Sequence, residues 1–238
     1  YSSLLVVIIY TLLVVAGSFA GPAWSSWMGA IAPSVEKRAS FFGKRNKIIG
    51  AISLIIGLLG SFILDYFEKT NIFIAFIILF GLSFVFRMRS AYLFKKQYEP
   101  KLELKEDYYF SFFSFIKRMR FNNFGKFTLF VAMFSGAVAI ASPFFAVYML
   151  TDLKLSYTFY MIIILASSLS SLLSMPLWGK IIDGFGAVKV MKFTGLFASL
   201  VPLFWLPSLL ISDLNMVLLF LVVVELISGF VWGGFNLA

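Results

Sequence analysis

Seven long apolar runs, separated by short polar segments, dominate the pattern of hydrophobic and polar positions along the chain. Each run approaches the roughly 20 apolar residues that a helix needs to cross the hydrocarbon core of a bilayer. Runs such as Leu4-Leu-Val-Val-Ile-Ile do not alternate between apolar and polar residues, as the strands of a membrane barrel do. The pattern therefore predicts seven spanning helices, at 4–31, 48–64, 71–86, 127–150, 156–178, 193–211 and 214–238.

Positive charges alternate between the two sides of these predicted helices. All but Lys69 and Lys154 of the 20 Lys and Arg residues lie in the segments after the first, third and fifth helices. Cytoplasmic loops of membrane proteins carry an excess of Lys and Arg, so we expect these three segments to be cytoplasmic. Topology then explains the net charge of +9, and we expect no nucleic-acid partner.

Composition agrees with an all-α membrane protein. Hydrophobic residues make up 61% of the chain and charged residues only 13%, against about 25% charged residues in an ordinary soluble domain. The chain has no histidine and no cysteine, which excludes Ser-His and Cys-His nucleophile pairs, Cys/His zinc sites and disulfides. We therefore expect no enzyme activity, no metal site and no cofactor.

Residues 95–126 form the only sizeable polar segment. Its first part is a charged linker, and its second part places apolar and basic residues at near-helical spacing. These are Tyr109, Phe112, Phe113, Ile116 and Arg120. We expect an amphipathic helix on the inner membrane face, which divides the chain into 1–94, 95–126 and 127–238.

The segment after the fifth predicted helix reads Gly179-Lys-Ile-Ile-Asp183-Gly-Phe-Gly186-Ala-Val-Lys189. The two glycines suit a tight turn with close backbone approach, and the acid can accept from helix amides or pair with a cation. The pattern resembles the cytoplasmic G-x-x-x-D-x-x-G-x-[R/K] loop of the major facilitator superfamily. In that family the loop lies between the second and third, or the eighth and ninth, of twelve helices.

Further features fit the second of these positions. A long cytoplasmic loop joins helices six and seven in the family, so the predicted segments correspond to helices four to ten of two six-helix pseudo-repeats. Gly21-Pro-Ala-Trp24 and Gly229-Phe-Val-Trp232 form a faint repeat, in agreement with parallel halves. The segments at 22–46 and 141–152 are similar to the corresponding segments of a prokaryotic branch of this superfamily. Both ends of the chain look cut, so we expect a longer protein. The Gly-Pro signature of drug antiporters is missing from the second helix.

The resemblance implies alternating-access transport of a small solute, by symport or antiport with a proton or another cation. A monomer in the cytoplasmic membrane of a prokaryote is expected. Glu225 lies about 16 Å along the last helix from Leu214, at 1.5 Å per residue, which places this acid near the bilayer middle. A charge there is costly and usually functional, so Glu225 is the candidate coupling residue. Helices one, four, seven and ten line the family's cavity, which adds Tyr10, Tyr148 and Asn236 as candidate contacts.

The motif after the fifth helix is the candidate cytoplasmic gate. We expect Asp183, with Lys180 and Lys189, to form a charged contact that is made in one state and broken in another. Arg38, in the first basic segment, is expected to make a matching contact. Two alternatives stay open: a sensor or scaffold of transporter fold that does not transport, and a seven-helix receptor. The receptor is disfavoured because the last helix has no lysine for a retinal Schiff base and the third has no Asp-Arg-Tyr.

Overall fold

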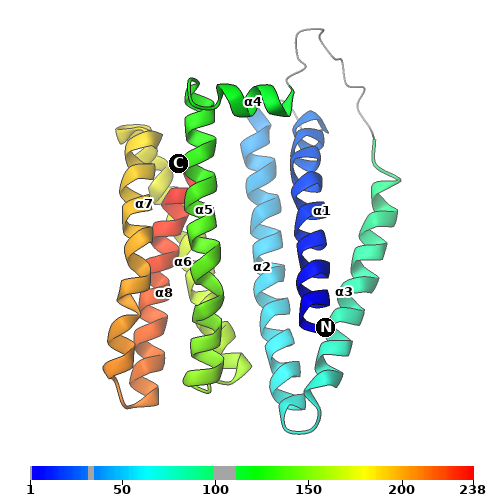
Figure 1. Ribbon diagram of the computed structural model, residues 1–238, viewed down its shortest axis with the longest axis vertical. Helices are drawn as coiled ribbons and strands as arrows, with labels where there is room; N and C mark the ends of the chain where they lie inside the picture. The colour runs from blue at the N-terminus through cyan, green and yellow to red at the C-terminus, as the bar shows by residue number, and fades with distance from the viewer. Residues whose placement is uncertain (1, 32–34, 99–110) are drawn as a thin grey trace. The chain divides into compact units, whose positions relative to one another are not determined.

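The computed structural model describes residues 2–31, 35–98 and 111–238, apart from some side chains near helix ends, mainly within 35–44. Its spanning helices are α1 (Ser2–Ile31), α2 (Val35–Glu68), α3 (Ile72–Phe94), α5 (Asn123–Val147), α6 (Tyr157–Phe185), α7 (Ala187–Phe204) and α8 (Leu214–Leu237) (Figure 1). Three short elements complete the order: helix α4 (Phe112–Arg118), the π-helical turn η2 (Tyr148–Asp152) and the 3₁₀ turn η3 (Leu206–Leu210). The described residues contain no strand.

All seven predicted spanning helices are confirmed, and each is long and apolar enough to cross a membrane. Several extend past their apolar runs. Helix α2 begins at Val35 and α7 at Ala187, both within segments that hydropathy marks as polar loops. A helix satisfies its own backbone hydrogen bonds, so it continues into the aqueous region until a cap or a turn residue ends it, whereas hydropathy detects only the part in hydrocarbon.

Two compact units divide the described chain, and the first comprises residues 1–52 and 80–118. Its apolar side chains are largely exposed. Near the cation-rich helix ends, which we call the basic ends, the Trp27 indole nitrogen donates to the Tyr98 carbonyl oxygen at 3.0 Å. The Arg45 guanidinium lies 4.5 Å from the centre of the Trp24 ring. These contacts anchor the tryptophans at the end of α1.

The short helix α4 is the described part of the predicted amphipathic helix. It ends in Lys117 and Arg118 and exposes the apolar side chains of Phe113 and Ile116. Tyr109 lies outside the described residues, and so does the side chain of Phe112. A place for α4 on the membrane surface stays a prediction.

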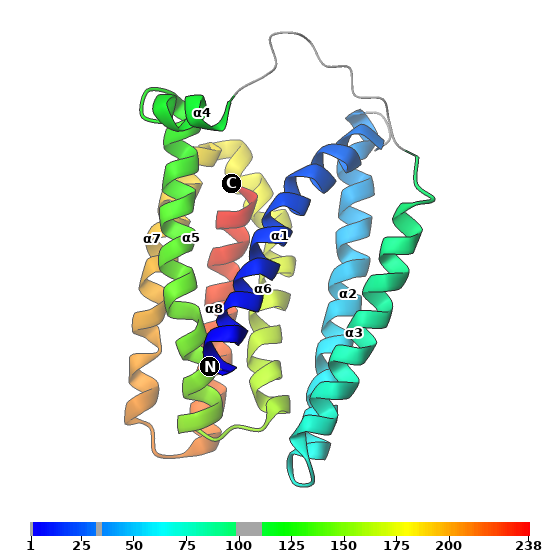
Figure 2. The same ribbon diagram turned by 45° about the vertical axis from the view of Figure 1, so that its right-hand side comes forward.

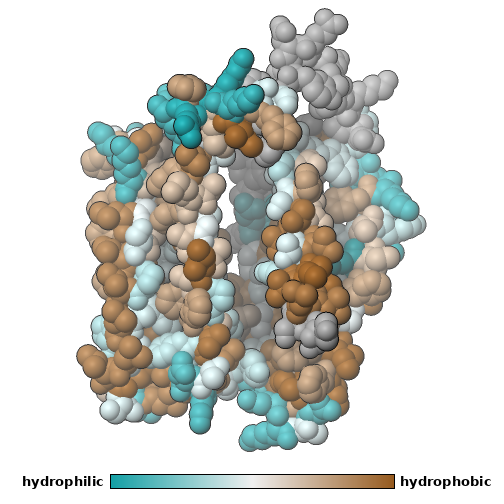
Figure 3. Space-filling view, viewed as in Figure 1, coloured by the Kyte–Doolittle hydropathy of each residue, from teal (hydrophilic) through white to brown (hydrophobic). Residues whose placement is uncertain are grey.

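The second unit comprises residues 53–79 and 119–238. Helices α5, α6, α7 and α8 run side by side in it (Figures 1 and 2). Their sides are largely apolar, and hydrophilic residues gather at the helix ends (Figure 3). Besides α5–α8, this unit contains the last part of α2 and the first part of α3, which lie away from the basic ends. The predicted division of the chain at 94 and 126 stays a prediction.

The buried core of this unit lies toward those opposite ends. Eight buried side chains form it: Met149, Leu155, Ile163, Val201, Trp205, Val217, Leu221 and Val224. They come from η2, α6, α7 and α8 and from the residues just after η2 and α7. Pro143 lies four residues before the last residue of α5, and η2 follows at once.

Candidate functional site

Glu225 lies in the middle of α8, half-buried, on the turn that follows the buried residues Leu221 and Val224. Its carboxyl lies within hydrogen-bonding reach of the Ser167 side chain of α6, and both residues line one cavity. Every other acidic residue that the structure describes is at a helix end or in a polar segment. Glu225 is therefore an acid held at mid-span, with a hydroxyl within reach on the neighbouring helix.

A cavity of about 230 Å³ borders this carboxyl. Three helices and the end of a fourth line it, with Ser142, Phe145, Ala146, Met149, Tyr160, Ile163, Ile164, Ser167, Ser168, Trp205 and Glu225. The carboxyl of Glu225 is the one charged group among them, and three serines and a tyrosine supply hydroxyls. Drug-sized ligands occupy pockets of about 300–1,000 Å³, so this cavity suits water molecules or a solute of few atoms.

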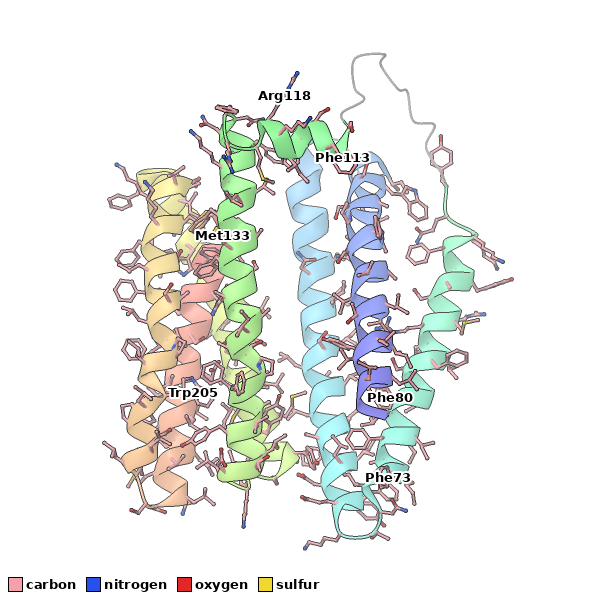
Figure 4. The ribbon with its side chains drawn as sticks, viewed as in Figure 1. Phe73, Phe80, Phe113, Arg118, Met133 and Trp205 are labelled. Carbon is pink, nitrogen blue, oxygen red and sulfur yellow. The ribbon has the colours of Figure 1, made fainter. Side chains whose placement is uncertain are left out.

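Two aromatic rings, those of Phe145 and Trp205, form the wall of the cavity that lies farther from the basic ends. The Trp205 ring packs against Phe145 of α5, with 4.6 Å between ring centres, and Figure 4 shows Trp205 beside that helix. Only 6% of Trp205 is exposed. Its indole nitrogen is buried and has no hydrogen-bond partner among the described residues. Apart from this N–H group, the two rings present apolar surface, which lowers the local dielectric around Glu225.

Close packing of α6 on α8 holds Glu225 and Ser167 together. One turn after Glu225, Gly229 lies so near Ser167 that a Cβ atom would overlap its carbonyl oxygen. Gly233 lies against Ser174 and Ser171, where a Cβ atom would come within 2.6 Å of the Ser174 hydroxyl oxygen. Small residues at this spacing let two helix backbones approach closely.

Hydrogen bonds between side chains of α6 and backbone carbonyls of α8 add to this packing. The Ser170 hydroxyl donates to the Leu226 carbonyl at 2.6 Å, and the Trp178 indole nitrogen donates to the Phe230 carbonyl at 2.7 Å. Both bonds cross the interface between α6 and α8. The relative position of α6 and α8 is thus fixed from Ser167 to Trp178.

The other predicted cavity residues do not line this cavity. Tyr148 shares a hydrogen bond of 2.9 Å with the Ser208 hydroxyl and packs edge-on against Trp205. Asn236 is exposed near the end of α8, about 16 Å along the helix from Glu225 at 1.5 Å per residue. Tyr10 belongs to the first unit and is 67% exposed. A role in solute binding stays a prediction for all three.

The predicted gate motif forms the end of α6 and the start of α7. Gly186 has a φ of 87°, in the left-handed region that favours glycine, and it makes the tight turn. A Cβ atom at Gly179 or at Gly186 would meet nothing within 4 Å among the described residues, so the expectation of close backbone approach is wrong at both glycines. Lys180 and Asp183 are exposed. The side chain of Arg38 lies outside the described residues, so the matching contact stays a prediction.

Lys189 has apolar surroundings. It borders a hollow of about 540 Å³ at the basic ends of α6, α7 and α8. Its other lining residues are Trp178, Ile181, Phe185, Val190, Phe193 and Phe230. The apolar stem of a lysine can cover such a surface while its ammonium group reaches water. Lys189 thus lies at an apolar surface, and its expected charged contact with Asp183 stays a prediction.

Sequence analysis missed several residues of the cavity, notably Tyr160, Trp205 and Ser142. One signal was present: Tyr160, Ile163, Ile164, Ser167 and Ser168 recur at helical spacing and so share one face of α6. No spacing rule connects that face with Trp205, because the tryptophan follows the last residue of α7. Only the packing of the bundle brings it to the cavity.

Comparison with known families identifies the chain. The Major Facilitator Superfamily model matches it over residues 1–238. Searches of curated proteins and of solved structures found no match. The family is one of membrane transporters, and the match covers the seven membrane-length helices found among the described residues. The chain is thus an integral, multi-pass membrane protein of a transporter family, and it belongs to the Major Facilitator Superfamily.

Proposed function

We propose that this transporter moves a small solute by alternating access and couples the movement to protons through Glu225. The observation that supports this proposal is the mid-span carboxyl beside a cavity with hydroxyl groups. An ionised carboxylate at the bilayer centre costs at least about 2.5–3.5 kcal/mol, so such a group is usually kept for a function. Protonation removes that cost, which makes the acid a suitable carrier of one proton.

The cavity supports proton exchange at this position. Its hydroxyls, on Ser142, Tyr160, Ser167 and Ser168, can hold water beside the carboxyl. Water held by these hydroxyls could pass a proton to the carboxyl, and the apolar rings of Phe145 and Trp205 offer no ligands to other ions. When the two halves of the transporter rock, the same carboxyl faces one side of the membrane and then the other.

The charge distribution supports an orientation with the basic ends in the cytoplasm. Nearly all Lys and Arg residues lie at these ends, and short cytoplasmic loops hold the excess of such residues. The ends opposite to them, with Asp65 and the first residues of α6, then face the outside. The cytoplasmic membrane of a prokaryote is the expected location.

Proton flux in liposomes tests the coupling role of Glu225. Full-length protein is reconstituted with a pH-sensitive dye inside, and a panel of small solutes is added outside. We expect one class of solute to drive proton movement in the wild type and not in Glu225→Gln, which cannot ionise. Glu68→Gln is the matched control, because it makes the same chemical change at an exposed helix end.

The outcomes separate coupling from transport. Solute-dependent proton flux in the wild type and in Glu68→Gln, but not in Glu225→Gln, would support the proposal. Solute uptake without proton movement, equal in all three proteins, would contradict it and indicate a uniporter or another coupling ion. No uptake of any solute by the wild type would favour a sensor or scaffold of transporter fold.

A further inference from the structure

One carboxylate joins α2 to α6 at the ends opposite to the basic ends. The Asp65 Oδ1 atom accepts a hydrogen bond from the Tyr157 backbone nitrogen at 2.7 Å, and its Oδ2 atom accepts one from the Thr158 backbone nitrogen at 3.0 Å. All three residues belong to the second compact unit. The bonded residues are more than 90 positions apart in sequence, so chain connectivity does not enforce this contact.

The start of α6 needs such a partner. The first backbone N–H groups of a helix have no acceptor inside it. Ser156, the local cap, accepts from Phe159 at 3.3 Å and leaves the N–H groups of Tyr157 and Thr158 to Asp65. A carboxylate at the positive end of a helix dipole makes charge-assisted bonds, which are stronger than neutral ones. The contact is therefore a bidentate cap supplied by another helix.

Small residues bring α2 close enough for this cap. Gly57, Ser61 and Asp65 recur every four residues and so lie on one face of α2. Ser61 is buried, with 4% exposed. A Cβ atom at Gly57 would come within 2.8 Å of the Met161 methyl group on α6. We call this face of α2, together with Tyr157, Thr158 and Met161, the α2–α6 contact.

The chemistry of the α2–α6 contact suits reversible separation. It includes two hydrogen bonds to one charged group and the approach of the Met161 methyl group to Gly57. When the helices part, water can hydrate both the carboxylate and the freed amides at this end of the membrane. Loss of one acceptor should therefore shift the equilibrium between closed and open contact without disrupting either helix.

We propose that Asp65 is a positioning residue of the transport cycle, which holds the α2–α6 contact closed on the outer side and releases it when the transporter opens outward. This inference rests on the proposed alternating access and on the proposed orientation. It does not require that Glu225 carry protons. In the structure described here the contact is closed.

Cysteine accessibility tests the proposal in the full-length protein. A Ser61→Cys reporter is placed at the buried position in a background without other cysteines, and a membrane-impermeant maleimide is added outside. We expect slow labelling, because Ser61 is only 4% exposed and lies on the face of α2 that carries Gly57 and Asp65. Adding Asp65→Asn should raise the labelling rate about tenfold, the change that corresponds to about 1.4 kcal/mol in an equilibrium. Thr70→Cys in the exposed turn after α2 reports surface expression and should label equally with and without Asp65→Asn.

Asp213→Asn is the matched control variant. Asp213 accepts a hydrogen bond from the Asn215 backbone nitrogen at 3.1 Å and so caps α8 at the same side of the membrane, but within the described residues it joins no second helix. Faster labelling of the reporter with Asp65→Asn and not with Asp213→Asn would support the proposal. Equal labelling rates with and without Asp65→Asn, or equal increases from both variants, would overturn it.

A second variant covers the case in which Asp65→Asn does not fold. Asp65→Glu keeps the charge and lengthens the side chain by one methylene, so both hydrogen bonds must lengthen or tilt. An increase in reporter labelling with Asp65→Glu, smaller than the tenfold increase expected for Asp65→Asn, would then support the proposal. Absence of folded protein for both variants would overturn it by showing a purely structural role. Labelling needs neither solute nor proton gradient, so its failure is distinct from failure of the proton-flux experiment.

Discussion

Backbone contact between α6 and α8 allows a quantitative test at Gly229. In Gly229→Ala the added Cβ atom overlaps the Ser167 carbonyl oxygen. A backbone oxygen cannot rotate away as a side chain does, so α8 must move off α6. Forcing extra volume into packed structure costs about 1–3 kcal/mol, and rigid neighbours place the cost toward the upper end. Alanine recovers up to about 1 kcal/mol through its higher helix propensity.

We therefore expect Gly229→Ala to lower the free energy of unfolding by about 2 kcal/mol, or roughly 30-fold in the equilibrium constant. The measurement is a titration of the full-length protein from mild detergent into sodium dodecyl sulfate, followed by tryptophan fluorescence. Gly136→Ala on α5 is the matched control, because a Cβ atom there meets nothing within 4 Å. That variant should equal or slightly exceed the wild type. If the two alanine variants were equally stable, the close approach of α6 and α8 would be refuted.

A functional effect should accompany the loss of stability. Glu225 lies one helical turn before Gly229, and Ser167, within hydrogen-bonding reach of its carboxyl, belongs to the segment that the new methyl group displaces. Separation of the helices lengthens the distance between these two side chains. The fraction of Gly229→Ala that remains folded should therefore show weaker proton coupling per molecule than the wild type in the liposome assay.

Two further predictions concern the turn between α6 and α7 and the residues near Trp205. Gly186→Ala should lower the free energy of unfolding by about 1–2 kcal/mol, because a side chain disfavours a φ of 87°. Gly184→Ala should not lower it, because Gly184 lies within α6 and has open space around it. The same titration measures both variants. Tyr148→Phe removes the hydrogen bond to Ser208 and should cost about 1 kcal/mol. Solute uptake by Tyr148→Phe should remain normal, and a large loss of uptake in a stable protein would instead support the predicted cavity role.

Hydropathy identified every spanning helix, because burial in hydrocarbon leaves a long apolar run that needs no knowledge of tertiary contacts. It failed at the helix ends. The segment 35–47 is rich in charged residues but helical, since charged side chains are compatible with a helix in water. At Gly186 the spacing of the motif correctly indicated a tight turn, whereas the expected close approach is wrong at both Gly179 and Gly186.

The candidate site could be predicted only in part. Glu225 stood out because an acid in a long apolar run is costly wherever the helix packs. Trp205 and Asp65 gave no such signal. A tryptophan just after a helix and an acid near a helix end are both common, and their contacts with Phe145 and with the start of α6 exist only after the helices assemble. Tertiary packing, which single-sequence patterns do not contain, decides these positions.

Backbone contact through glycine also makes the α6–α8 pair mechanically stiff. The distance between two helices separated by side chains varies with rotamers and temperature, whereas contact between glycine and a backbone carbonyl leaves little room for adjustment. A change in bilayer thickness must then be taken up by tilting the pair as a whole or by fraying at its ends. The spacing between Glu225 and Ser167 should consequently stay constant in thin and thick lipids, so differences in activity between such lipids would arise elsewhere in the protein.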